Sequence, residues 1–371
     1  MAYLVFKDGT TFEGEEFGAW LKGLNSVTEQ EVVFNTSMSG YQEMVTDLSY
    51  AGQILVLTQP QIGNYGWHHE ENEADKTRLQ GLIVRELSDG EGSLHAEGSL
   101  EDYCQQHGVK GLKGVDTRAL TRYLREFGTL PGVLVHTREI GLEFWANFQE
   151  HDKAKEKSEH WVYRSTVKEA YEIPGLGSLI AVLDFGAKRN IVRHLQKRGF
   201  RIMVFPAGST PEEILRHRPS GIVLSNGPGD PEELPECVAT VRGLYDKLPV
   251  LGICLGHQLL ALAAGGETYK LPYGHRGGNH PVLDVRTEKA TMTAQNHGYA
   301  VQEASLAGSG FEVTLRNLND GTVEGMEHDT YPILSVQFHP EGAPGPEENA
   351  EIFDRFKELV ESSSLIRKGR N

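Results

Sequence analysis

The sequence predicts two domains of different class, a mixed, β-rich α+β domain followed by an α/β domain. Three observations support this. Short strand-like runs separated by Gly-rich and Asp-rich turns occupy the first hundred residues. A charged stretch without periodicity covers 147–168, and Pro174-Gly175 follows it. Beyond this stretch, apolar runs alternate with amphipathic helical runs. We therefore expect a boundary near residue 172, with domains at 1–172 and 173–362, as a chain of 371 residues also suggests.

The N-terminal domain is expected to combine short strands with one longer helix. Strands are predicted over 3–6, 32–34, 54–57 and 82–84. The periodicity over 117–127 predicts a helix. Together these elements indicate a mixed, β-rich arrangement.

The second domain alternates strands with helices in the manner of an α/β fold. Predicted strands cover 179–184, 202–205, 221–224 and 250–253, and predicted helices cover 190–198, 211–216, 239–244 and 256–264. Continuously apolar strands are typical of a mostly parallel sheet with helices on both faces. An active site is expected at the carboxyl ends of such strands. The short basic tail, 363–371, is predicted to be disordered.

Charge and composition exclude several functional classes. The chain has 36 Lys and Arg against 52 Asp and Glu, a net charge of −16, which argues against general nucleic-acid or membrane-surface binding. No apolar stretch approaches the roughly 20 residues of a membrane helix, and the run at 2–6 is too short for a signal peptide. Three cysteines suit a reducing compartment, so we expect a cytoplasmic protein.

Cys254 lies where a predicted strand meets a predicted helix, in the motif Gly252-x-Cys254-x-Gly256. This is the layout of a nucleophile elbow with Cys in place of Ser. A thiolate at a helix N-terminus is stabilised by the helix dipole, and neighbouring amides point to the place where an oxyanion would form. A buried structural cysteine is the alternative, but the two glycines favour a nucleophile.

A candidate base follows the apolar strand 333–338, in His339-Pro340-Glu341. Residues two apart in extended backbone point to the same face, so the imidazole and the carboxylate can lie side by side. In this arrangement His339 would accept the thiol proton and Glu341 would orient the imidazole. A loop histidine beside a solvated carboxylate is the alternative.

These motifs resemble those of a known family. Segments 252–258 and 338–341 look like the nucleophile and base motifs of class I, triad-type glutamine amidotransferases. Further segments resemble the small, glutamine-hydrolysing subunit of carbamoyl phosphate synthetase: 224–231, 277–282, 295–301, 31–43, 61–65, 81–86 and 114–122. The resemblance covers nearly the whole chain. The sequence departs from the family pattern in the 87–97 loop and at Tyr299, where Phe is common.

The resemblance implies a role for individual residues. Cys254 would be the nucleophile, and His339 and Glu341 would complete the triad. Contacts with L-glutamine would be made by Ser49, Gly227, Gly229, Leu255, Gln258, Asn296, Gly298 and Tyr299. The amides of Gly227 and Leu255 are candidates for an oxyanion hole. From the residues alone, 226–231 could equally be a tight turn, Gln258 a first-turn helix residue, and Asn296 and Tyr299 surface turn residues.

The implied reaction is hydrolysis of glutamine to glutamate and ammonia through a γ-glutamyl thioester. No phosphate-binding fingerprint is evident in the sequence, so this chain should only supply ammonia. ATP, Mg²⁺ and bicarbonate are expected in a large partner subunit, which would pair with this chain through the N-terminal domain as a heterodimer or as part of a higher assembly. The product would serve arginine synthesis, pyrimidine synthesis or both.

No cofactor or metal is expected in the chain itself. The sequence contains His257, His275, His280 and His297, which we interpret as loop histidines with local hydrogen bonds. His68 and His69 are interpreted as part of a solvated loop.

Two other functions compete with the amidotransferase interpretation. A free-standing cysteine hydrolase, such as a peptidase or γ-glutamyl hydrolase, would not need so large an N-terminal half. A non-catalytic relative would be expected to have lost a triad residue.

Overall fold

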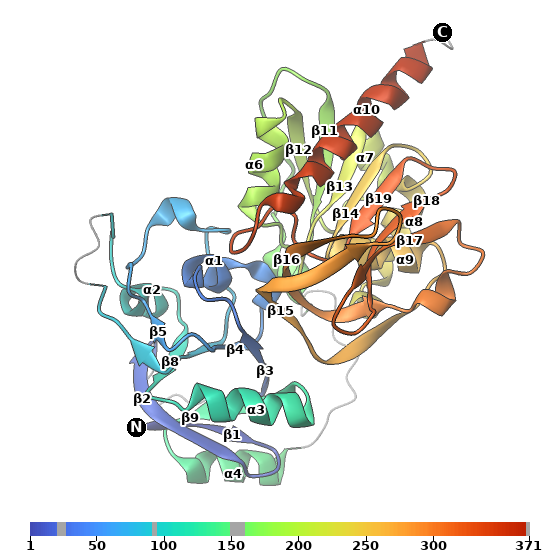
Figure 1. Ribbon diagram of the computed structural model, residues 1–371. Coiled ribbons are helices and arrows are strands. Elements are labelled where there is room, and N and C mark those ends of the chain that lie inside the picture. Colours follow the sequence, from blue (N-terminus) through green and yellow to red (C-terminus); the bar gives the residue numbers. More distant parts are fainter. Residues whose placement is uncertain (21–26, 91–94, 149–159, 369–371) are drawn as a thin grey trace. The chain divides into compact units, whose positions relative to one another are not determined.

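The computed structural model describes residues 1–20, 27–90, 95–148 and 160–368, with the side chains of 364–368 excepted. It contains two compact units, Met1–Lys155 and Glu156–Asn371 (Figure 1). The division falls before the boundary expected near residue 172. The reason is that β10 (Tyr171–Ile173) pairs with β12 of the second unit, and Val162 of α5 (Trp161–Ser165) joins a core of that unit.

The N-terminal unit is built around a closed barrel. Its strands, in barrel order, are β1 (Ala2–Phe6), β2 (Thr11–Gly18), β8 (Lys110–Lys113), β6 (Gly81–Ile83), β4 (Ile54–Leu57), β3 (Gln30–Asn35) and β9 (Leu130–Val135). The pairs β3–β4, β4–β6 and β6–β8 are parallel and the other pairs are antiparallel. The expected β-rich, mixed domain is therefore present.

Short helices accompany this barrel, and local capping explains where two of them begin. Its helices are α1 (Tyr41–Thr46), α2 (Leu100–Gln106), α3 (Thr117–Phe127) and α4 (Arg138–Asn147), with 3₁₀ turns η1 (Leu48–Tyr50) and η2 (His69–Glu71). Ser99 forms a capping box with Asp102 at the start of α2, and Asp116 accepts the Ala119 amide at the start of α3. The short strands β5 (Gln61–Ile62) and β7 (Glu86–Leu87) pair separately.

The second unit contains one mixed sheet rather than the mostly parallel sheet that we expected. Its strands, in order, are β10, β12 (Arg201–Pro206), β11 (Leu179–Asp184), β13 (Gly221–Leu224), β14 (Val250–Ile253), β19 (Ile333–Val336), β18 (Val323–His328), β17 (Phe311–Asn317), β15 (Thr268–Asp284) and β16 (Lys289–Val301). Strands β12, β11, β13, β14 and β19 are parallel, and β10 and β18 to β16 are antiparallel. The antiparallel strands are half polar, so they lack the continuous apolar pattern from which the parallel ones were predicted.

Helices cover both faces of the parallel strands, as expected (Figure 1). On one face Ile214 and Val241 pack against alternate residues of β11, and on the other face Ile191 and Phe353 pack against the residues between them. The helices are α5, α6 (Arg189–Lys197), α7 (Pro211–Arg216), α8 (Pro235–Leu244), α9 (Leu255–Ala263) and α10 (Ile352–Lys368), with 3₁₀ turns η4 (Pro231–Glu233), η5 (Glu303–Leu306) and η6 (Glu348–Glu351).

Helix α10 also corrects the prediction of a disordered tail beginning at residue 363. The helix continues to Lys368, because extending an existing helix costs far less than starting one. Residues 369–371 lie outside the described residues. Among the helices of the described ranges, none combines the length and apolar character needed to span a bilayer.

Candidate active site

Cys254 lies between β14 and α9 in a strained backbone conformation, with φ of 53° and ψ of −104°. Positive φ is costly for a residue with a Cβ, so the surroundings must hold it in place. The Cys254 amide donates to the Val336 carbonyl at 2.8 Å. A Cβ at Gly256 would lie 2.3 Å from the Leu224 carbonyl oxygen, and one at Gly252 would lie 2.6 Å from Leu260. Both glycines are therefore needed for the turn, which has the geometry of a nucleophile elbow.

The thiol of Cys254 is buried, with 2% of the residue exposed. Its sulfur donates to the Asn296 carbonyl oxygen at 3.7 Å, which connects the turn before α9 to strand β16. The elbow therefore presents the thiol to neighbouring strands of the same unit rather than to bulk solvent.

His339 and Glu341 form a buried pair just beyond β19. His339 Nδ1 lies 2.7 Å from Glu341 Oε1, and the two residues are 2% and 0% exposed. The second imidazole nitrogen, Nε2, has no hydrogen-bond partner among the described residues. Burial by itself lowers the pKa of His339, but the Glu341 carboxylate and the Cys254 sulfur overcome this effect and raise it. The site thus stabilises the imidazolium that forms when the thiol proton moves to His339.

Lys188 is a buried cation beside this pair, and the sequence motifs did not indicate it. Its Nζ lies 3.1 Å from Glu341 Oε1 and donates to the Gly342 carbonyl, while its own amide donates to Asn226 Oδ1 at 3.0 Å. Burial raises the pKa of Glu341, but Lys188 and His339 outweigh burial and lower it. One feature of the sequence could have indicated Lys188. It follows an apolar strand that was predicted to be parallel, and active sites form at the carboxyl ends of such strands.

The two candidate oxyanion-hole amides belong to the loop after β13 and to the first residue of α9. A Cβ at Gly227 would lie 2.5 Å from the Phe185 carbonyl oxygen and 2.8 Å from the Leu255 side chain. Within the described residues, neither the Gly227 nor the Leu255 amide donates to another protein group. Both are therefore available to a developing negative charge.

The other implied glutamine contacts lie in several elements. Gln258 on α9 is buried and donates to the Tyr299 carbonyl at 2.8 Å and to Gln337 at 3.0 Å. Asn296, Gly298 and Tyr299 lie on β16. Gly229 follows β13 with φ of 92°. Ser49 belongs to the N-terminal unit, in η1, where its amide donates to Asp47.

The four histidines interpreted as loop residues lie instead in regular secondary structure. The structure places His257 on α9, His275 and His280 on β15, and His297 on β16. His257 is fully buried beside Ser335, at 2.9 Å, and burial lowers its pKa to about 3. The helix that carries His257 was expected over 256–264. No strands were expected at the other three histidines, because charged and polar residues interrupt the apolar alternation there.

Two groups have ligand atoms within 4.8 Å of one another and could hold a cation: His68, His69 and Glu97, and His275, His297 and Glu324. In the first group His69 and Glu97 are solvent-exposed side chains 2.6 Å apart. In the second, both oxygens of Glu324 already accept hydrogen bonds from amide side chains. We assign neither group to a metal, and the absence of a metal requirement stays a prediction.

Comparison with known proteins gives consistent matches over both units. Residues 181–359 match the family Glutamine amidotransferase class-I, and residues 4–134 match Carbamoyl-phosphate synthase small chain, CPSase domain. Among curated relatives, the carbamoyl phosphate synthase small chain of Symbiobacterium thermophilum is 49% identical over 97% of this chain and 98% of that protein. The small chains of Bacillus caldolyticus and Clostridium acetobutylicum are each 46% identical over 96% of this chain, and over 96% and 99% of those proteins.

A crystal structure from Thermoplasma acidophilum, described as that of a GMP synthase subunit, is 26% identical to this chain. It covers 52% of this chain and 98% of its own, with a TM-score of 0.46. The full-length similarity to the curated relatives decides the family. The chain belongs to the carbamoyl phosphate synthase small chain family.

Proposed function

We propose that this chain is the glutamine-hydrolysing subunit of a carbamoyl phosphate synthase. It would release ammonia from L-glutamine and pass it to a large, ATP-dependent subunit. The observation that carries the proposal is the buried set of Cys254, His339 and Glu341, with the cysteine held in a strained elbow. The alternative of a free-standing hydrolase is not favoured, because the N-terminal unit also matches the small-chain family.

The first half of the reaction acylates Cys254. The sulfur attacks the γ-carbonyl carbon of glutamine, and the thiol proton goes to His339 Nε2, the nitrogen left without a partner among the described residues. Glu341 holds the other nitrogen at 2.7 Å and stabilises the imidazolium. The amides of Gly227 and Leu255 would stabilise the oxyanion. When the C–N bond breaks, His339 returns the proton to the leaving amine, which gives ammonia and a γ-glutamyl thioester.

The second half hydrolyses the thioester. His339 accepts a proton from the attacking water, the tetrahedral intermediate collapses, and the proton returns to the Cys254 sulfur. Glutamate leaves and the free thiol is restored. Lys188 keeps Glu341 ionised throughout, because it lies 3.1 Å from that carboxylate inside the protein.

The remaining glutamine contacts are part of the same proposal. Gly229, Gln258, Asn296, Gly298 and Tyr299 would bind the substrate around the elbow. The resemblance also implies a glutamine contact by Ser49. Gln258 supports this assignment because its buried amide connects α9 with the backbone of Tyr299.

The partner would carry out the ATP-dependent steps. We propose a heterodimer in which the large subunit binds ATP, Mg²⁺ and bicarbonate, and in which the N-terminal unit of this chain faces the partner. Ammonia would protonate in water at neutral pH, which is a physical reason for a sheltered transfer between the subunits. A cytoplasmic location is part of the proposal.

The test is reconstitution of this chain with the large subunit encoded in the same genome. We expect the complex to form carbamoyl phosphate from glutamine, ATP and bicarbonate, with glutamate released in step. The large subunit by itself should use only added ammonia. A complex that uses ammonia but never glutamine would contradict the proposal, and so would peptide hydrolysis by this chain in the absence of a partner.

A further inference from the structure

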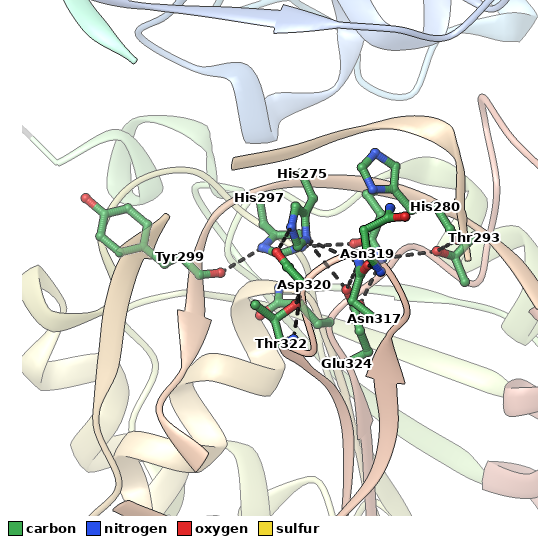
Figure 2. Close-up of polar contacts among 12 residues, drawn as sticks. His275, His280, Thr293, His297, Tyr299, Asn317, Asn319, Asp320, Thr322 and Glu324 are labelled. Carbon is green, nitrogen blue, oxygen red and sulfur yellow. Dashed lines mark hydrogen bonds and ion pairs between the residues drawn. The ribbon is translucent and has the colours of Figure 1, made fainter. Parts of the chain in front are cut away.

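A buried polar network lies in the antiparallel part of the sheet, outside the triad. Its members come from four strands and one loop (Figure 2). They are His275 on β15, Gln295 and His297 on β16, Asn317 on β17, Asp320 in the β17–β18 loop, and Glu324 on β18. All are buried except Asp320, and Glu324 is 0% exposed. Burying polar and charged side chains costs free energy unless each of them has hydrogen-bond partners.

Glu324 is the centre of this network. One carboxylate oxygen accepts a hydrogen bond from Asn317 Nδ2 at 2.8 Å, and the other accepts one from Gln295 Nε2 at 2.9 Å. His275 Nδ1 lies 3.6 Å from the first oxygen. The carboxylate therefore holds two amide side chains from neighbouring strands in fixed orientations.

His275 supplies the positive charge that balances the buried carboxylate. Its Nε2 lies 2.7 Å from Asp320 Oδ2, so the imidazole is between two acidic groups. Burial by itself lowers the pKa of His275, but Glu324 and Asp320 raise it overall. Asp320 is in turn held by the amide and the hydroxyl of Thr322.

The network continues into the proposed glutamine site. Gln295 Oε1 lies 2.9 Å from His297 Nε2, and His297 Nδ1 lies 2.7 Å from the Tyr299 carbonyl oxygen. The same carbonyl accepts a hydrogen bond from Gln258 at 2.8 Å. Asn296, between Gln295 and His297, accepts from the Cys254 sulfur through its backbone oxygen. Burial lowers the pKa of His297 well below its ordinary value, so the neutral ring donates to only one of its two oxygen partners. The network thus contacts the segment of β16 that carries three proposed glutamine contacts.

We propose that Glu324 is a positioning residue for glutamine, acting through Gln295 and His297 on residues 296–299. The network fixes this segment before the substrate arrives, so it sets glutamine affinity more than the chemistry at Cys254. This inference rests on the proposed glutaminase function.

The test is Glu324→Gln in the complex with the large subunit. The substitution keeps the shape of the side chain but replaces one acceptor by a donor, so either Asn317 or Gln295 loses its hydrogen bond to residue 324. It also removes a negative charge beside His275. We expect KM for glutamine to rise about tenfold, the size of effect typical of one lost hydrogen bond to a charged group. We expect kcat to change by less than about threefold, and ammonia-dependent synthesis to be unchanged.

Glu327→Gln is the matched control on the same strand. Glu327 binds Arg286 at 2.6 Å and also binds Arg355, without a contact to β16 in the described part of the chain. We expect its KM to equal that of the wild type. A change that only destabilised the fold would lower the amount of active enzyme and thus the apparent kcat, while KM would stay constant.

Asp320→Asn is a milder second variant should Glu324→Gln fail to fold, because Asp320 is partly exposed. It weakens the charge pairing of His275, and we expect KM to rise about threefold. An unchanged KM in the folded variants, or an equal rise in the Glu327→Gln control, would overturn the positioning role. A wild-type complex that does not hydrolyse glutamine would remove the proposed function and this inference with it.

Discussion

The two units both bury polar side chains, but they partner them differently. In the N-terminal unit, Asn35 donates to the Tyr50 hydroxyl at 2.8 Å and Gln42 donates to Asn72 at 2.8 Å, while the buried Asp47 carboxylate accepts a backbone amide. In the second unit, Lys188, His339 and Glu341 form a charged set in the interior.

Buried polar atoms that have no hydrogen-bond partner also differ between the two units. Among the described residues, the unpaired buried atoms of the N-terminal unit belong to neutral side chains such as Gln53 and Gln59, whereas in the second unit they include His339 Nε2 and Glu341 Oε2. A buried ionisable atom without a partner costs stability. Such an atom is expected where substrate or a reacting proton takes the place of a partner. The charged set that would perform the proposed chemistry therefore belongs to the second unit.

Replacement of Cys254, the proposed nucleophile, should have the largest effect on activity. We expect Cys254→Ser to lower glutamine-dependent carbamoyl phosphate synthesis about 10³-fold or more, while ammonia-dependent synthesis continues, because the nucleophile is lost and the partner is intact. Steady-state assays with glutamine and with ammonium measure both.

Cys104→Ser is the matched control in the N-terminal unit. Cys104 is 0% exposed on α2, and burial raises its pKa to about 12. We expect this variant to keep glutaminase activity. Retained activity in Cys254→Ser, or its loss in a folded Cys104→Ser, would contradict the division of roles.

Removal of the buried cation should have the next largest effect. Lys188→Met leaves the Glu341 carboxylate without its main counter-charge, and breaking a buried pair in this way costs about 3–5 kcal/mol of stability. We also expect glutaminase activity to fall about 100-fold, because Glu341 then orients His339 less well. Urea titration and glutamate release measure the two effects. Lys110→Met, on the barrel strand β8, serves as control and should keep full activity.

Replacing a glycine by alanine in each unit tests how tightly the elbow is packed. Gly256→Ala places a Cβ 2.3 Å from the Leu224 carbonyl oxygen, and we expect a loss of about 1–3 kcal/mol in the free energy of unfolding. Gly98→Ala in the N-terminal unit places a Cβ that meets no atom within 4 Å, and its effect should stay within about 0.5 kcal/mol. Equal effects in thermal or urea unfolding would mean that the elbow is not tightly packed.

The pH dependence of stability should have opposite signs at one histidine of each unit. The raised pKa of His339 adds stability that is present below its ordinary pKa of about 6.5 and is lost as pH rises through the raised value. Burial lowers the pKa of His107, so this histidine disfavours the folded state as pH falls below about 6.5.

Glu341 adds a third contribution at the acidic end. Its lowered pKa gives stability that is present above about 4.5 and is lost as pH falls through the lowered value. Unfolding titrations across pH should show that His339→Gln reduces the alkaline loss, and that His107→Gln reduces the loss on acidification. The same sign for both variants would contradict the two environments.

Local patterns predicted the elbow and the His339–Glu341 pair well, because strand, turn and helix signals lie within a few residues of one another. Lys188 was missed because its partner is contributed by a different strand connection, and no local signal relates the two. Strands β15 to β18 were missed for a related reason. Glu324 and His275 are buried because they pair with each other across strands, and in the sequence alone each of them resembles a surface residue. The resemblance named Asn296 and Tyr299 as candidate glutamine contacts, which stays a prediction, and the network behind them needed the structure.

Glutamine hydrolysis by the proposed route requires a covalent intermediate between Cys254 and glutamine. Acid quenching of the complex during turnover, followed by mass spectrometry of its peptides, tests this directly. We predict that the peptide containing Cys254 gains the mass of one γ-glutamyl group, and that the peptides containing Cys104 and Cys237 do not. Glutamine turnover without any such adduct on Cys254, or with the adduct on another cysteine, would contradict the role of Cys254 as nucleophile.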